Sequence, residues 1–383
     1  MKRANLELYG TLKDGCKVKL TIILADGRRI ERWGELPANK ELADLLDDWR
    51  EGYGSLKHPF RIRPARVRYN LSLEEIGSRA IALVEGLRRW LDCDKFRPLD
   101  KKLRQAFNWD DEICYTIRTD CSQLRQLPWH RWDLIETYPF AALAFSSLDV
   151  PEPPPPPFPI NDRVRILAIL GNSNGIDVEK DRQLLRDLPN ADVTFLVEPK
   201  STDIHDSLWE QRWDIIFFAG HGETIDGEGV LYINPNDAIK LEQLWYGLRK
   251  ATDNGLKLAI FNSCNGLGLV RQLDDWQLPL AIVMREAVPD FVAQEFLTNF
   301  LKAFAEQKLP FYQAAREARE RLQGWENDIP CASWLPVIYQ HPDIDPPAWE
   351  QLYCHSVDLG GDRDLDPPED EERVPQPSKR KWV

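Results

Sequence analysis

The chain has 383 residues, of which 43% are hydrophobic and 10% aromatic, and its formal net charge is −13 at pH 7. This composition excludes a wholly disordered or fibrous protein and suffices for two or three packed domains. The acidic balance argues against direct contact with nucleic acid. No uncharged apolar run reaches the roughly 18–20 residues that cross a bilayer, and the N-terminus lacks the apolar block of a secretion signal. We therefore expect a cytoplasmic protein that contacts no membrane.

Seven cysteines are scattered along the chain without a CxxC pair, and no HExxH motif occurs. These spacings encode neither a disulfide framework nor a common zinc site. We expect reduced thiols, no metal and no cofactor.

The first piece of the chain, residues 1–58, is predicted to be a β-rich extension. Alternating apolar residues predict strands over 5–33, and a Leu- and Asp-rich stretch predicts a helix over about 40–51. Two roles are open for this piece. It is a docking module for a partner, or a structural extension packed on the core.

The second piece, residues 59–150, is predicted to hold a strand near Arg66–Tyr69 and a long helix from Ser72 to Leu91. Glu75 lies three residues after Ser72, which is the spacing of a capping box at a helix start.

Residues 151–159 contain seven prolines in nine positions. Such a run forms a stiff polyproline II spacer and cannot join a helix or a central strand. We interpret it as a surface connector between two halves of the chain. A ligand for a proline-binding module is the alternative.

Residues 160–342 alternate short apolar strands with helical segments, which indicates a parallel sheet covered on both faces. A hairpin strand, two amphipathic helices and a last strand are expected to complete this half, whereas 343–383 is acidic, proline-rich and expected to be disordered. The expected strands are 163–170, 192–197, 214–219, 229–233, 256–261, 279–284 and 335–339, and the helices about 178–188, 203–211, 240–252, 265–273, 290–307 and 311–324.

Chemically active side chains follow two of these strands. His221 lies between two glycines after one strand, and Cys264 follows another. Because the carboxyl ends of parallel strands meet at one edge of the sheet, a thiol and a base can meet there. Taken singly, Cys264 is more often a buried inert cysteine, and His221 a structural histidine. Their joint placement supports the catalytic interpretation and leaves the structural one open.

The residues around both side chains resemble the CHAT domain, a branch of the caspase-like peptidases related to separases and metacaspases. The segments that carry the resemblance are Phe217–Gly222 and Ala259–Cys264, supported by Leu127–Trp129 and by Leu280–Asp290. The resemblance extends over roughly residues 65–342. It implies an α/β fold with a caspase-like, mostly parallel sheet and helices on both faces, preceded by a smaller α+β N-terminal region. Residues 59–150 would be the N-terminal half of the CHAT region and residues 160–342 the catalytic half.

The resemblance also implies cysteine endopeptidase activity. Cys264 would attack the scissile carbonyl, and His221 would protonate the leaving amine. The backbone N–H groups of Gly222 and Cys264 would form the oxyanion hole. No third residue that would orient His221 is apparent. Caspases proper carry Gln-Ala-Cys-x-Gly at the nucleophile, whereas this chain has Asn262–Gly266, so cleavage after Asp is unsupported.

Arg285, Glu286 and Asp290 follow another strand and are candidates for the pocket that receives the substrate side chain. They could equally be ordinary loop charges. Because acids outnumber Arg285 near the inferred cleft, with Glu223 and Asp226 among them, we expect a basic residue before the cut.

The expected partners are a protein substrate and a separate regulatory or sensor protein, in a bacterial signalling or defence system. No repeat of 20–50 residues is found that would form a fused sensor. The alternative is a non-catalytic caspase-fold scaffold or interaction protein; the presence of both His221 and Cys264 favours the enzyme. A nucleotide-binding protein is a third option. The loop Gly171–Gly175 lacks the glycine spacings of nucleotide sites, and a strand-to-helix loop at the rim of the site is favoured.

Overall fold

The computed structural model describes residues 1–56, 71–150, 161–174, 176–225, 228–263 and 278–353. Three predicted features lie outside these ranges: the strand near Arg66–Tyr69, the spacer at 151–159 and the helix at about 265–273.

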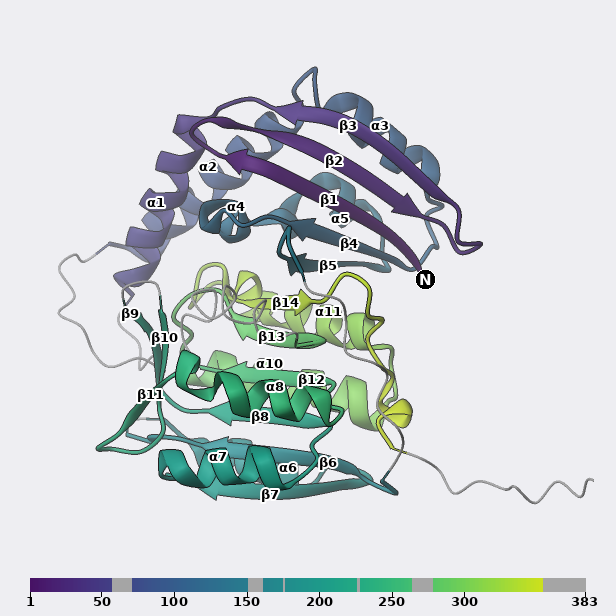
Figure 1. The fold of residues 1–383 in the computed structure, drawn as a ribbon. Helices are drawn as coiled ribbons and strands as arrows, with labels where there is room; N and C mark the ends of the chain where they lie inside the picture. The colour runs from purple at the N-terminus through teal and green to yellow at the C-terminus, as the bar shows by residue number, and fades with distance from the viewer. Residues whose placement is uncertain (57–70, 151–160, 175, 226–227, 264–277, 354–383) are drawn as a thin grey trace, which may run out of the picture.

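One mostly parallel sheet of eleven strands runs through the described parts of both halves of the chain. Its order is β3-β2-β1-β4-β5-β14-β13-β12-β8-β6-β7, which can be followed from top to bottom in Figure 1. The strands are β1 (Lys2–Thr11), β2 (Gly15–Ile23), β3 (Arg29–Leu36), β4 (Ile113–Arg118), β5 (Ala141–Ser146), β6 (Val164–Leu170), β7 (Ala191–Val197), β8 (Ile215–Ala219), β12 (Leu258–Asn262), β13 (Leu280–Met284) and β14 (Pro336–Gln340).

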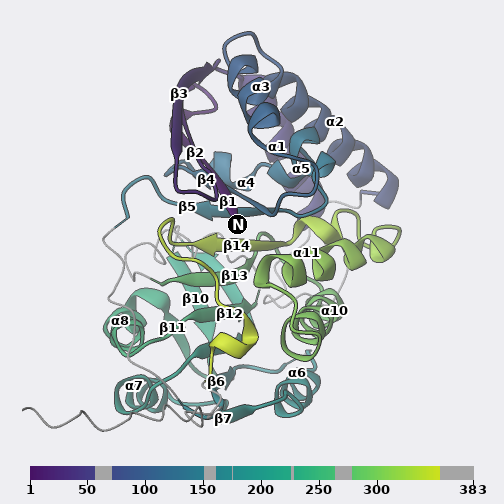
Figure 2. The ribbon, with the colours of Figure 1, turned by 90° about the vertical axis from the view of Figure 1, so that its right-hand side faces the viewer.

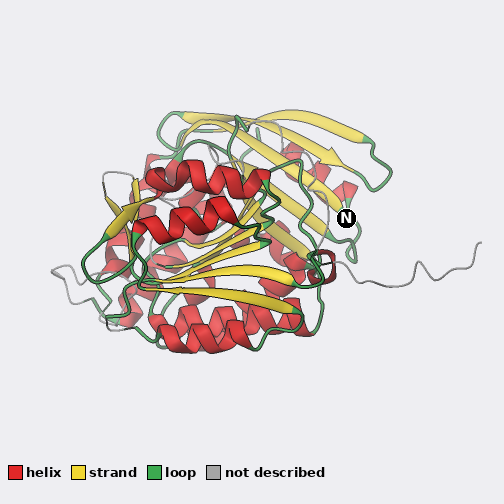
Figure 3. Ribbon diagram, turned by 60° about the horizontal axis from the view of Figure 1, so that its bottom comes forward, coloured by secondary structure: helices red, strands yellow, loops and turns green. Residues whose placement is uncertain are grey.

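The C-terminal half of the sheet lies between two helix layers, as expected. Strands β6, β7, β8, β12 and β13 pair in parallel. Every residue of β8, β12 and β13 is buried, because helices cover both faces of these strands. Helices α7 (Ser201–Glu210) and α8 (Trp245–Asp253) lie on one face (Figures 2 and 3). The other face carries α6 (Val178–Arg186), α10 (Asp290–Leu301) and α11 (Phe311–Arg321). The predicted α/β class is confirmed.

The predicted α+β N-terminal region is present, and its strands continue the same sheet. Strands β1, β2 and β3 form an antiparallel meander, and β1 then pairs in parallel with β4. Helices α1 (Lys40–Gly54), α2 (Leu73–Leu91), α3 (Arg97–Ala106) and α5 (Asp133–Thr137) lie on one face of these strands (Figure 2). The opposite face exposes polar side chains such as Lys17, which explains the alternating pattern of the sequence here.

The helix ends and connections follow the local sequence. Ser72 and Glu75 form the expected capping box at the start of α2: each backbone N–H donates to the other residue's side chain, at 2.7 and 3.1 Å.

No helix in the described residues combines the length and apolar character needed to cross a bilayer. The shorter helical segments are α4 (Ser122–Gln126), Trp129–Arg131, Leu241–Leu244, Lys302–Glu306, Leu322–Trp325, Ala332–Trp334 and Trp349–Gln351.

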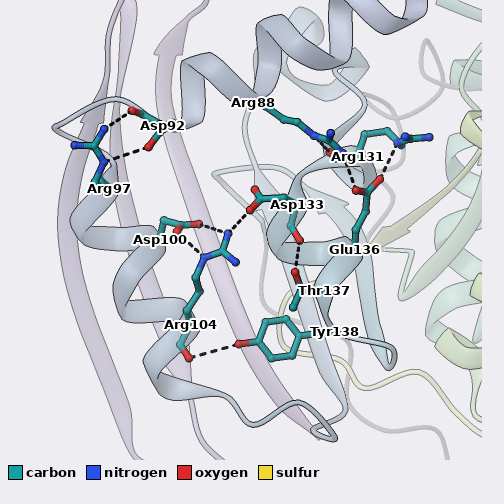
Figure 4. Close-up of polar contacts among 10 residues, drawn as sticks. All are labelled: Arg88, Asp92, Arg97, Asp100, Arg104, Arg131, Asp133, Glu136, Thr137 and Tyr138. Carbon is teal, nitrogen blue, oxygen red and sulfur yellow. Dashed lines mark hydrogen bonds and ion pairs between the residues drawn. The ribbon is translucent and has the colours of Figure 1, made fainter.

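Arginine–carboxylate pairs link the N-terminal helices to one another (Figure 4). Arg104 of α3 contacts Asp100 of its own helix and Asp133 of α5, both at 2.7 Å. Glu136 of α5 accepts contacts from Arg88 of α2 and from Arg131, at 2.7 and 2.8 Å. The carboxylates thus offset the charges of these arginines locally.

Residues 343–353 after β14 pack onto the protein, so the expectation of disorder is wrong for this part of the segment. Trp349 has 1% of its surface exposed, and its ring meets that of Phe304 edge-on at a centroid distance of 5.7 Å. Leu352 and Tyr353 are also buried. These apolar anchors outweigh the acidic composition of the segment. Residues 354–383 lie outside the described ranges.

Candidate active site

His221 lies directly beyond the carboxyl end of β8, between this strand and β9 (Gly222–Ile225). The five apolar residues of β8 are buried in the sheet, and the chain turns at Gly220 toward a small sheet of β9, β10 (Glu228–Tyr232) and β11 (Ala238–Lys240). The backbone N–H of Tyr232 donates to the carbonyl of His221 at 3.0 Å. Only 5% of His221 is exposed. The histidine is therefore held by the hairpin and shielded from solvent.

The imidazole of His221 has one ring nitrogen bonded and one available. Nε2 lies 2.7 Å from the backbone carbonyl of Asn174. A carbonyl can only accept, so Nε2 carries the proton and donates it. Nδ1 is buried and has no hydrogen-bond partner among the described residues. This tautomer leaves the Nδ1 lone pair free to accept a proton.

The loop between β6 and α6 carries the Asn174 carbonyl and is fixed at both ends. At its start, Gly171 N donates to Ala219 at the end of β8, at 2.8 Å, and Asn172 N donates to the carbonyl of Tyr232 at 2.9 Å. The Asn172 side chain then accepts from Asn174 N at 3.0 Å. The favoured interpretation of this segment, a strand-to-helix loop at the site, agrees with these contacts. Gly175 lies outside the described residues.

Gly171 fills a position that has no room for a side chain. A Cβ there would lie 2.4 Å from the carbonyl oxygen of Tyr232 and 3.1 Å from the Phe218 ring. We expect Gly171→Ala to lower the free energy of unfolding by about 1–3 kcal/mol, as overpacking does. Chemical denaturation measures this change. Gly324→Ala is the control because its Cβ would meet nothing within 4 Å, and equal costs for both variants would contradict the prediction.

Asp290, one of the predicted pocket residues, holds the far end of the same loop. Its carboxylate accepts from Asp177 N at 3.1 Å and from Gln294 Nε2 at 3.0 Å, and Gln294 Nε2 also donates to the Asp177 carbonyl at 2.9 Å. The first turns of α10 thus anchor the loop that contacts His221. Asp290 therefore lies beside the loop that contacts His221. Its contact with a substrate remains a prediction.

The strand beside β8 leads to Cys264. Strands β8 and β12 are parallel neighbours, and their register pairs Ala219 with Asn262. Ser263 is fully buried, and its hydroxyl has no partner among the residues described. Cys264, the predicted nucleophile and oxyanion-hole residue, lies outside the described residues.

Arg285 and Glu286, the other predicted pocket residues, contact the N-terminal half of the chain. Arg285 is 1% exposed, and its Nη1 donates to the carbonyls of Gln126 and Leu127, each at 3.1 Å. Glu286 accepts from Arg50 Nε at 2.7 Å. Neither side chain contacts His221, so their role in a substrate pocket remains a prediction.

Comparisons with known proteins agree with this geometry. The family model of the CHAT domain matches residues 173–354. This segment of the chain is therefore similar to the CHAT domain over its full matched length. The match begins in the loop that contacts His221 and runs through the packed residues after β14, whereas the resemblance noted in the sequence reached from about residue 65 to 342. Curated proteins offer no match to the sequence.

Solved structures show a similar caspase-like fold over most of the chain. Separase from Saccharomyces cerevisiae, solved in complex with securin, aligns with a TM-score of 0.51 and 10% identity over 88% of this chain and 30% of the separase chain. The chain thus spans about a third of the separase length. The Arg-specific cysteine proteinase gingipain R of Porphyromonas gingivalis aligns with a TM-score of 0.40 and 11% identity, over 80% of this chain and 76% of that one.

The group that orients His221 could not be predicted from the sequence. It is a backbone carbonyl, that of Asn174, 47 positions away in sequence. Any residue type carries a backbone carbonyl, so the sequence does not mark this contact. It arises because the loop after β6 crosses the end of β8. The contacts of Asp290 and Gln294 with Asp177 were hidden for the same reason, since α10 lies far along the chain.

Proposed function

We propose that this protein is a cysteine endopeptidase that cleaves a protein substrate with Cys264 as nucleophile and His221 as acid and base. The observation that carries the proposal is the buried Nδ1 of His221, which has no partner in the described part of the chain. A buried imidazole nitrogen without a hydrogen bond is costly for stability alone. A proton-transfer role accounts for it.

The strand register supports the same pairing. His221 follows Ala219 by two residues, and Cys264 follows Asn262 by two residues, where Ala219 and Asn262 are aligned neighbours. A nucleophile and its base need to lie within hydrogen-bond reach, which adjacent parallel strand ends provide.

The proposed reaction has two stages. His221 Nδ1 takes the thiol proton of Cys264, and the thiolate adds to the scissile carbonyl while the backbone N–H groups of Gly222 and Cys264 stabilise the oxyanion. The C–N bond breaks as Nδ1 returns the proton to the leaving amine, giving an acyl-enzyme. Water, deprotonated by the same nitrogen, then releases the new carboxyl terminus and restores the thiol. Throughout, the Asn174 carbonyl holds the Nε2–H and stabilises the imidazolium.

We further propose that a separate regulatory or sensor protein controls the cleavage, in a bacterial signalling or defence system. The related fold of separase was solved in a complex with securin. The described helices lie on one face of β1, β2 and β3 (Figure 2), and the other face, which exposes Lys17 as well as Tyr9 and Trp33, offers a surface for docking of such a protein.

The test is incubation of the full chain with a proteome-derived peptide library, wild type against Cys264→Ala, read by mass spectrometry. New peptide termini that appear with wild type and are absent with the variant support the enzyme. A wild type without new termini, even in a lysate that contains its partners, favours the alternative of a non-catalytic caspase-fold scaffold.

The preferred residue before the cut is proposed to be Arg or Lys. Two acids lie on segments near His221 or Asp177: Glu223, whose carboxylate accepts from the Tyr232 hydroxyl, and Asp290. The third predicted acid, Glu286, is paired with Arg50. Arg285 is the one predicted basic residue of the pocket, and its Nη1 donates to two backbone carbonyls of the N-terminal half. Paired fluorogenic peptides that differ only in Arg or Asp at this position measure the choice. Faster cleavage after Asp, or after a small apolar residue, would overturn this preference and leave the dyad untouched.

A further inference from the structure

A small cavity lies where the two halves of the sheet meet, away from His221. It is lined by apolar residues of β5, β13 and β14, together with His130, Arg285, Arg316 and Arg319. Its volume is about 30 Å³. The join of β5 with β14, where Ala144 aligns with Ile338, forms part of its wall.

Arg285 lines this cavity, and two of its guanidinium nitrogens lack hydrogen-bond partners among the described residues. Its Nη1 is bonded to carbonyls, but Nε and Nη2 are buried with no partner in the described ranges. Nε and Nη2 lie side by side along one edge of the planar guanidinium group. Two donors in this arrangement bind an anion in a bidentate manner. Burial lowers the pKa of Arg285 to about 10, so the group remains charged at neutral pH.

His130 and Arg319 add further donors. His130 is 8% exposed, and its Nε2 is buried without a partner among the residues that the structure describes. Burial, followed by the nearby arginines Arg319, Arg285 and Arg131, keeps the pKa of His130 well below its usual range, so the ring is neutral. Burial also lowers the pKa of Arg319 to about 10, which leaves this side chain cationic as well.

Ion pairs offset the charges of Arg131 and Arg316, whereas Arg285 and Arg319 form no ion pair among the described residues. Arg131 contacts Glu136 (Figure 4), and Arg316 contacts Glu320 at 2.6 Å while its Nη1 donates to two carbonyls. By contrast, none of the described residues that line the cavity carries a carboxylate, and neither Arg285 nor Arg319 forms an ion pair within the described chain. Buried cationic groups without a counter-charge are costly, and a bound anion would remove the cost.

We propose that this cavity binds one small inorganic anion of the size of chloride, held by Arg285 Nε and Nη2 with His130 and Arg319. The volume decides the size: about 30 Å³ holds one or two water-sized groups and is too small for an organic ligand. Because the cavity wall includes both β5 and β14, the anion links the N-terminal half to the CHAT domain and stabilises their shared sheet.

The experiment measures the Tm of the full chain in sodium chloride and in sodium gluconate at equal ionic strength. We expect Tm to rise with chloride until it saturates, as for ligand binding at one site, and to rise less in gluconate. The site variants are Arg285→Met and Arg319→Gln, and both should lose the saturating shift. The control is Arg321→Gln on the same helix, whose partner is the exposed Glu317, and it should keep the shift.

If Arg285→Met does not fold, Arg319→Gln still tests chloride binding, because it replaces a less buried side chain. A bromide soak of crystals should also give an anomalous peak beside Arg285. Equal Tm curves in chloride and gluconate, or an unchanged chloride shift in Arg319→Gln, would overturn the proposal. A saturating shift that appears only with phosphate or acetate would overturn the assignment of a chloride-sized ligand.

Discussion

His221→Ala is expected to lower peptide cleavage by about 10²–10⁴-fold, the usual contribution of a positioned acid and base. The expected structural cost is smaller. Losing the bond from Nε2 leaves the Asn174 carbonyl without its donor, at about 1–3 kcal/mol of unfolding free energy. His221 is 5% exposed, so its replacement should cost more stability than that of an exposed loop histidine.

His221→Gln provides the matched comparison, since an amide can still donate to Asn174 but cannot transfer protons at neutral pH. We expect it to be as inactive as the alanine variant and more stable. His205→Ala, on α7, is the control for removing a histidine elsewhere. Cleavage that survives in His221→Gln, or a collapse of the fold in both His221 variants, would favour a structural role for the histidine.

Trp349→Ala is expected to have the largest effect on stability, at about 3–5 kcal/mol, as for other buried tryptophans. Trp349 packs against Phe304 behind the sheet and is 1% exposed. Urea denaturation gives the free energy of unfolding. The control is Trp109→Ala, because Trp109 is 66% exposed and should cost less than about 0.5 kcal/mol. A loss below about 1 kcal/mol in Trp349→Ala would mean that residues 343–353 do not support the fold.

Most of the C-terminal half could be predicted from the sequence because its strands are buried on both faces. Continuous apolar runs such as that of β8 have few alternatives, and the helices between them set the parallel connections. The order of strands and helices along the chain then places His221 at the end of a strand, and this position can be predicted without knowledge of long-range contacts.

The remaining features depend on contacts that the local sequence does not encode. The pairing of β1 with β4 joins residues about 110 positions apart, so the continuity of the sheet could not be seen in either segment. Trp349 and Leu352 lie in an acidic segment and are buried through contacts that are distant in sequence, such as that of Trp349 with Phe304. The carbonyl of Asn174 and the donors around the arginine-lined cavity likewise come from separate elements.

The central claim, an activated thiol paired with His221, can be tested without knowing the substrate. The full chain is treated with iodoacetamide near neutral pH, and the labelling rate of each of the seven cysteines is measured by peptide mapping. The account predicts that Cys264 reacts faster than the other six and that His221→Ala removes this advantage. Equal rates for Cys264 and Cys354 in wild type, or a fast Cys264 that His221→Ala leaves unchanged, would contradict it.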